Sequence, residues 1–144
     1  MTEYLHSNNE FEVLIEKIKN IPYGRNSNRS DFSLVIKEQK GTCSSKHAFL
    51  KDYADKNQIT NVKLFIGIFK MTELNTTKIY PLSFYDKIKN DILEEIEIEP
   101  DQVVEFKIQF HQTFLKNWIS KSHQSKTFEE IWNIREKCIQ KLSL

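Results

Sequence analysis

Residues 62–69 form the one stretch of this chain with a clear strand pattern, and this limits the sheet that the chain can build. The segment is rich in β-branched and aromatic residues, which strands favour. Elsewhere most apolar residues recur every three or four positions, which is the period of an amphipathic helix. We therefore predict an α+β fold that is mainly helical, with a small, reduced β-sheet.

Apolar spacing also orders the first half of the chain. It predicts a first helix over 9–19 and a second helix that starts at Thr42, just after Gly41. Residues 21–30 are polar and contain turn-forming residues, so we expect a loop there. Residues 32–36 are a short apolar run with β-branched residues, which favours an extended stretch or a brief strand.

The second half of the chain carries stronger helix signals. Ser83 with Asp86 resembles a capping box, and Thr127 with Glu130 resembles another. The first predicts a helix that continues through the apolar positions to residue 92, and the second predicts a final helix to 142. Pro100 is suited to the first position of a long helix that keeps its period to about residue 121.

Some patterns in this half have two interpretations. Residues 104–110 also alternate as a strand does, although the longer helical period favours the helix. The acidic residues of 94–100 alternate with isoleucines, which is typical of a turn or a short edge strand with a solvated face. Trp118 and Trp132 fall among apolar helical positions, so we expect both side chains in the core.

Composition excludes several classes of protein. A chain of 144 residues predicts a single domain over 1–144, with carboxy-terminal helices in 82–144. The 21 basic and 20 acidic residues leave a net charge of +1, which offers no field to attract nucleic acid. No apolar run approaches the roughly 20 residues of a membrane span, and the first residues lack a secretory signal. Cys43 and Cys138 lie far apart and build no disulfide framework, which suits the cytoplasm.

Cys43 follows a glycine and falls in the first turn of a predicted helix. Unpaired amides and the positive end of the helix dipole stabilise a thiolate there, and the thiolate is the nucleophilic form. Backbone amides of Gly41, Thr42 and Ser44 could receive the oxyanion formed when a carbonyl is attacked. The alternative is that Cys43 is a small packing residue, as free cysteines often are.

Residues 21–25 (IPYGR) and 41–47 (GTCSSKH) together resemble the amino-terminal half of transglutaminase-like proteins, members of the papain-like thiol-hydrolase superfamily. Segments 94–100 and 131–138 are similar too, so the resemblance covers most of the chain. It implies a truncated papain-like fold whose nucleophile-helix half is 1–71. It also implies that Cys43 occupies the nucleophile position.

Other residues are candidates for binding or base catalysis. Tyr23 and Arg25, with the basic residues near them, could hold a carboxylate or phosphate near the start of the Cys43 helix, although Arg25 could instead tie its loop to carbonyls. The resemblance implies a histidine and an aspartate or asparagine on later strands, but 75–91 contains no histidine. The chain therefore looks like a member that lost its general base. His47, four residues after Cys43, and His111, on the apolar stripe of the long helix, are replacement bases, but helix-bound or packing roles fit both.

These observations predict a transglutaminase-like thiol hydrolase or acyltransferase that is weak or inactive, acting on a peptide, amide or ester. No cofactor is expected, and no metal, because Cys43 and His47 lack a third ligand at a suitable spacing. The alternative is a non-catalytic protein that binds a ligand, a protein partner or a second copy through the helices of 100–142.

Overall fold

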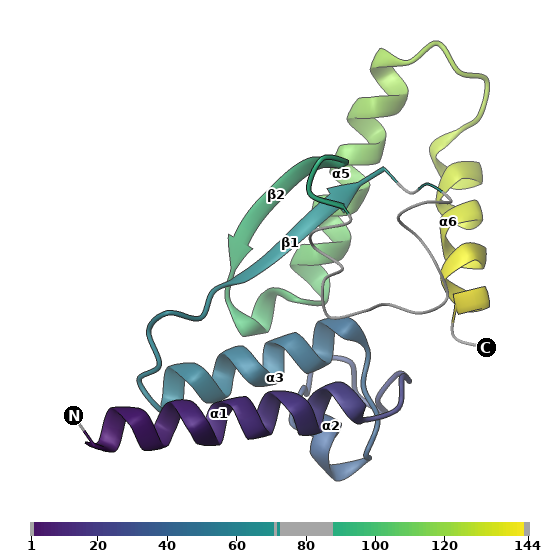
Figure 1. Cartoon of the computed structure of the whole chain (residues 1–144). Coiled ribbons are helices and arrows are strands. Elements are labelled where there is room, and N and C mark those ends of the chain that lie inside the picture. The colour runs from purple at the N-terminus through teal and green to yellow at the C-terminus, as the bar shows by residue number, and fades with distance from the viewer. Residues whose placement is uncertain (1, 71, 73–87, 143–144) are drawn as a thin grey trace. The chain divides into compact units, whose positions relative to one another are not determined.

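The computed structural model describes residues 2–70, 72 and 88–142 (Figure 1). The elements follow the chain in the order α1 (Thr2–Asn20), α2 (Leu34–Lys37), α3 (Cys43–Lys56), β1 (Leu64–Phe69), β2 (Ile92–Ile98), the 3₁₀ helix η1 (Pro100–Gln102), α5 (Glu105–Lys121) and α6 (Phe128–Leu142). In this part of the chain β1 and β2 form a two-stranded sheet. The prediction of a mainly helical α+β fold with a small sheet is confirmed.

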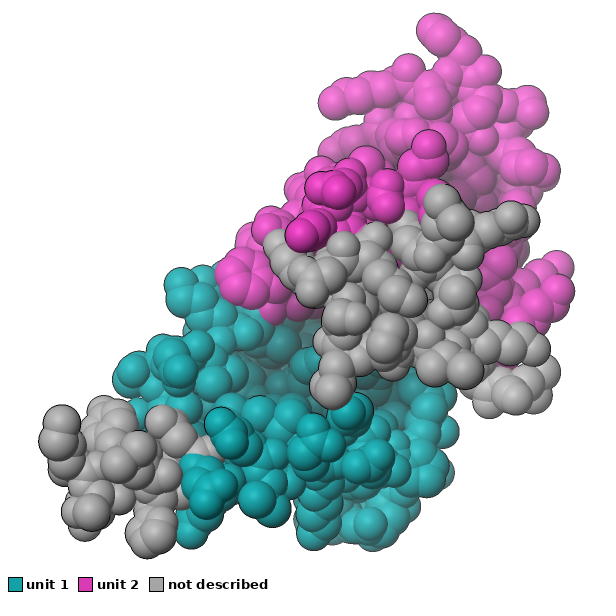
Figure 2. Space-filling model, viewed as in Figure 1, with its two compact units in different colours: residues 1–64, 97–107 teal, residues 65–96, 108–144 magenta. Residues whose placement is uncertain are grey.

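Contacts between residues divide the chain into two compact units (Figure 2). Unit 1 comprises residues 1–64 and 97–107, and unit 2 comprises residues 65–96 and 108–144. Unit 1 therefore contains α1, α2, α3 and η1. Unit 2 contains α6 and most of α5 and of both strands.

The core of unit 1 lies between α1 and α3. Phe11 of α1 stacks on Tyr53 of α3, with ring centroids 6.0 Å apart, beside the buried side chains of Ala54 and Ile59. A second buried cluster joins α1 to α2 and consists of Ile18, Ile21 and Val35. The apolar spacing that predicts the first helix is thus the spacing of its buried face, although the helix begins earlier, at Thr2.

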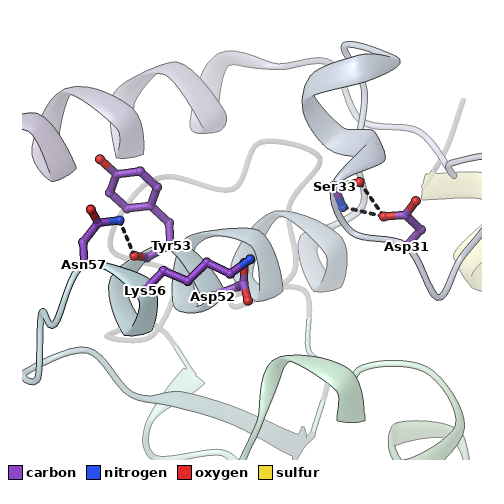
Figure 3. A network of polar contacts seen from close by, with 6 residues as sticks. All are labelled: Asp31, Ser33, Asp52, Tyr53, Lys56 and Asn57. Carbon is purple, nitrogen blue, oxygen red and sulfur yellow. Dashed lines mark hydrogen bonds and ion pairs between the residues drawn. The ribbon is translucent and has the colours of Figure 1, made fainter.

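The prediction of an extended stretch over 32–36 is wrong, because residues 34–37 form α2. The carboxylate of Asp31 accepts hydrogen bonds from the amide of Ser33, at 3.0 Å, and from its hydroxyl, at 2.5 Å (Figure 3). The amide of Leu34 then donates to the Asp31 carbonyl. This local turn begins the helix and directs Val35 into the core, where its side chain is fully buried.

The carboxyl end of α3 is held by polar contacts within the helix (Figure 3). The side-chain amide of Asn57 donates to the Tyr53 carbonyl at 2.8 Å, and Lys56 pairs with Asp52 at 2.7 Å. The amide of Ile59 returns to a carbonyl of α3, which brings its side chain into the core. The helix therefore ends where the chain turns toward β1.

β1 and β2 are antiparallel neighbours. The amide of Lys70 donates to the Asp91 carbonyl at 2.9 Å, while Gly67 lies opposite Glu94 and Glu95. The strand predicted over 62–69 is confirmed, although it starts two residues later. Of the two interpretations of 94–100, the strand is confirmed through Ile98, and its glutamates are exposed.

The helix interpretation of 104–110 is also confirmed, since α5 runs to Lys121 as predicted. Pro100, however, opens η1 and not the long helix itself. The capping box before α6 is present: the amide of Thr127 donates to the Glu130 carboxylate at 2.7 Å, and the amide of Glu130 donates back to the Thr127 hydroxyl at 3.3 Å. Local hydrogen bonding thus sets where α6 begins.

Two predictions for this half are wrong. Trp118 is 45% exposed and not in the core, because α6 meets α5 through His111 and Lys116 instead. The apolar pattern of the helix predicted from 83 included Ile92, which begins β2. The first part of that helix, 83–87, lies outside the described residues.

Candidate functional site at the amino terminus of α3

The site begins with a close contact between two loops of unit 1. Tyr23 and Gly41 form a parallel bridge, in which the Gly41 amide donates to the Pro22 carbonyl at 3.1 Å and its carbonyl accepts from Gly24 at 3.2 Å. A Cβ atom on Gly41 would lie 3.1 Å from three other side chains. Segments 21–25 and 41–47 therefore meet in space, and a Cβ atom at position 41 would require its neighbours to shift.

A buried asparagine holds the loop that leads to Gly41. The side-chain amide of Asn26 donates to the Glu38 carboxylate at 3.0 Å and to the Lys40 carbonyl at 2.9 Å. The amide and hydroxyl of Ser27 donate to the same carboxylate. Hydrogen bonds from Ser27 and then from Asn26 lower the pKa of Glu38. Sequence analysis missed this contact, because nothing in the residue pattern pairs positions 26 and 38.

Thr42 is the N-cap of α3, so the helix begins at Cys43, one residue after the predicted start. Its hydroxyl accepts from the Ser45 amide at 3.2 Å, and its amide donates to the Ser45 hydroxyl at 2.9 Å. The amides of Gly41 and Thr42, predicted to face an oxyanion, are thus engaged within the protein. The amides of Cys43 and Ser44 meet no acceptor among the described residues, as is usual in the first turn of a helix.

Cys43 is the first residue of α3 and is exposed. Two lysines lie at this end of α3. Lys46 donates to the Ile21 carbonyl, and burial lowers its pKa while the thiol of Cys43 opposes that shift. Lys107, from the first turn of α5, lies with its Nζ 2.5 Å from the Ser44 hydroxyl. Sequence analysis missed Lys107, because it is 63 residues from Ser44 in the chain.

His47 is oriented by its own helix. Its Nδ1 lies 2.8 Å from the Cys43 carbonyl oxygen; because a carbonyl can only accept, Nδ1 carries the proton and Nε2 is the basic nitrogen. His47 is exposed, and the partial desolvation of its ring by neighbouring atoms is the main cause that lowers the pKa of His47. The carbonyl bond opposes the shift, and the charges of Lys107 and Lys46 add to it.

The lowered pKa of His47 predicts a loss of stability in acid. The unfolded chain takes up a proton near the ordinary value of 6.5, before the folded protein does, so stability falls as pH drops below that value. The fall ends once the pH is below the folded pKa. Urea midpoints at pH 7.5 and 5.5 measure this loss, and His47→Gln should reduce it. If the wild type and His47→Gln lose the same stability between the two pH values, His47 is not the cause of the loss.

His111 belongs to unit 2 and is engaged there. Its Nδ1 accepts a hydrogen bond from the Arg135 guanidinium at 3.1 Å, and its ring meets Trp132 edge-on at 5.7 Å between centroids. Tyr23 is 47% exposed and Arg25 is exposed. Of the residues predicted for the site, the described contacts of unit 1 bring together Tyr23, Gly41, Thr42, Cys43, Ser44 and His47.

The comparisons with known proteins add no family. No protein-family model, curated protein or solved structure matches this chain. The resemblance to transglutaminase-like proteins therefore stays a prediction. Among the described residues, no helix combines the length and apolarity needed to span a membrane, and no three His, Cys, Asp or Glu side chains gather as metal ligands.

Proposed function

We propose that the amino terminus of α3 is a thiol site of the transglutaminase-like kind, in which Cys43 attacks a carbonyl but turns over slowly or not at all. The observation that carries the proposal is the exposed Cys43 thiol at the first position of the helix. The amides of Cys43 and Ser44 support it, because unpaired amides stabilise both a thiolate and an oxyanion. Peptides, amides and esters are the substrates that this chemistry fits, and two free cysteines suit the cytoplasm.

Weak turnover follows from the groups around the thiol. After attack, a leaving amine needs a proton, and hydrolysis of the thioester needs a base to activate water. His47 lies on the same helix as the thiol, with its Nδ1 bonded to the Cys43 carbonyl. In unit 1, no other histidine is among the residues whose side chains are described. An activated ester, whose leaving group needs no proton, is therefore the substrate that tests the thiol most directly.

The two exposed cysteines provide a matched pair for alkylation. Cys43 begins a helix, at the positive end of its dipole, whereas Cys138 lies toward the carboxyl end of another helix, at the negative end. At pH 7 we expect iodoacetamide to alkylate Cys43 about threefold to tenfold faster than Cys138. Intact mass of the Cys43→Ala and Cys138→Ala variants measures the two rates. Equal rates, or a faster Cys138, would contradict the thiol site.

A p-nitrophenyl ester then separates attack from turnover. The Cys43 sulfur forms a thioester bond, the ester C–O bond breaks, and p-nitrophenolate leaves with the bonding electrons. We expect a burst of one equivalent per chain, lost in Cys43→Ala and kept in Cys138→Ala. Sustained release that Cys43→Ala abolishes would contradict slow turnover, and the absence of a burst would contradict the attack.

We also propose a second function, association with another protein chain through α5 and α6. Among the residues of these helices whose side chains are described, none is buried, and Trp118 and Ile134 are 45% and 48% exposed. Helices that bury so little within their own chain have apolar surface available for a partner. Sedimentation velocity from about 10 μM to 1 mM tests self-association, with Trp118→Arg as the variant of α5. A single monomer species throughout this range would contradict association between copies.

A further inference from the structure

We propose that α6 pairs with α6 of a second copy of this chain, in antiparallel orientation, through the side of the helix centred on Ile134. The inference rests on the second proposed function and adds the partner, the helix and the geometry. The surface concerned, called the Ile134 face, consists of Glu130, Ile131, Ile134, Lys137, Cys138 and Lys141.

These six residues share one side of α6, because they recur at intervals of three and four. Ile134 is 48% exposed, and every other member except the half-buried Ile131 is exposed. A different side of the helix meets α5. There Trp132 contacts His111, and the Lys116 ammonium lies 4.9 Å from the centroid of the Phe128 ring. The Ile134 face therefore takes no part in those contacts.

The charges on this face do not satisfy one another within the helix. Glu130 precedes Lys137 by seven residues and Lys141 by eleven, which places them about 10 Å and 16 Å apart along the axis. Lys137 and Lys141 are instead neighbours at i,i+4, where like charges repel. Neither lysine forms an ion pair with any described residue. The face therefore favours a partner that presents an acidic group between the two lysines.

A second copy of α6 presents such a group when it runs antiparallel. With a twofold axis beside Ile134, the partner's Glu130 lies level with the gap between Lys137 and Lys141, and the same contact forms again on the other side of the axis. The two Ile134 side chains meet at the centre. In a parallel pair, by contrast, Glu130 would face Glu130 and the lysines would face lysines. The charge pattern thus selects both the partner and its direction.

The size of the face sets the strength of association. One side of a 15-residue helix covers less than the roughly 800 Å² per partner of a standard stable interface. We therefore expect a weak dimer whose population rises with protein concentration. Because salt screens ion pairs at the surface, we also expect the dimer to be weaker in high salt.

Disulfide trapping tests the geometry directly. In a Cys43→Ser and Cys138→Ser background, Ile134→Cys places one thiol near the proposed axis. Gln140→Cys is the matched control, because residue 140 is exposed and lies about 120° around the helix from residue 134. Under mild oxidation at high protein concentration, we expect at least tenfold more disulfide-linked dimer from Ile134→Cys on a non-reducing gel. Equal yields from the two variants would overturn the pairing.

Charge exchange provides an independent test. Lys137→Glu with Lys141→Glu should weaken self-association at least fivefold in sedimentation equilibrium, and adding Glu130→Lys should restore it. Circular dichroism measures the helix content of each variant, because Glu130→Lys also removes the carboxylate that accepts a hydrogen bond from the Thr127 amide at the start of α6. If self-association persists unchanged in the double variant, the pairing through the Ile134 face is wrong, while the second proposed function stays in place. If the wild-type chain stays monomeric up to 1 mM, both the pairing through the Ile134 face and self-association through α5 and α6 are wrong.

Discussion

Replacing Ile18 by alanine is expected to lower the free energy of unfolding by about 2–5 kcal/mol. Ile18 is 1% exposed and packs against Ile21 and Val35, where α1, α2 and α3 meet. Alanine removes three carbon atoms from this cluster, and surrounding helices close the resulting cavity only in part. Urea unfolding followed by far-ultraviolet circular dichroism measures the change.

Val13 provides the control on the same helix. Its side chain is 66% exposed, so Val13→Ala should change the unfolding free energy by no more than about 0.5 kcal/mol. Trp118 and Trp132 both belong to unit 2, so tryptophan fluorescence reports on that unit while circular dichroism reports on all helices. If Ile18→Ala lowers the urea midpoint measured by circular dichroism but not the midpoint measured by fluorescence, the two units unfold separately. Equal midpoints for Ile18→Ala and Val13→Ala would contradict the core assignment.

Elements set by a few neighbouring residues were predictable from the sequence. Thr42 and Thr127 each form their hydrogen bonds with a residue three positions later, so the motif and the structure are both local. The strand β1 was predictable for a similar reason. Its β-branched and aromatic residues suit a pleated surface whichever strand pairs with it.

Segments whose residue pattern fits both a strand and a helix were not predictable from neighbouring residues. Residues 32–36 carry β-branched side chains, but the Asp31 carboxylate captures the Ser33 amide and starts a helical turn. The wrong placement of Trp118 has a different cause. Apolar spacing predicts a helix without specifying which side of it the neighbouring helix covers.

In the candidate site, too, local features were predictable from the sequence and long-range contacts were not. The position of Cys43 at the start of a helix was predictable, because a glycine and a capping threonine precede it. The contact of Lys107 with Ser44 depends on how the chain folds back after β2, and no local pattern records it. Chain topology likewise places His111 in unit 2, where Arg135 binds it.

Replacing Gly41 by alanine is expected to destabilise unit 1 by about 1–3 kcal/mol. The added Cβ would lie 3.1 Å from atoms of Val35, Ser45 and Lys46, and none of the three moves easily. The Val35 side chain is fully buried. The Ser45 hydroxyl completes the cap of α3, and the Lys46 ammonium donates to a carbonyl of the preceding loop.

Gly67 is the matched control for this substitution, because an added Cβ there would lie 3.6 Å and 3.7 Å from its nearest neighbours, at ordinary contact distances. Gly67→Ala should be neutral or stabilise the protein by about 0.5–1 kcal/mol, since glycine in a strand loses more entropy on folding. Urea midpoints compare the two variants. Gly41→Ala should also change the alkylation rate of Cys43, because relief of the clash displaces the first turn of α3, whereas Gly67→Ala should not. A Gly41→Ala protein with the wild-type midpoint and alkylation rate would mean that the close contact between the two loops does not position the thiol.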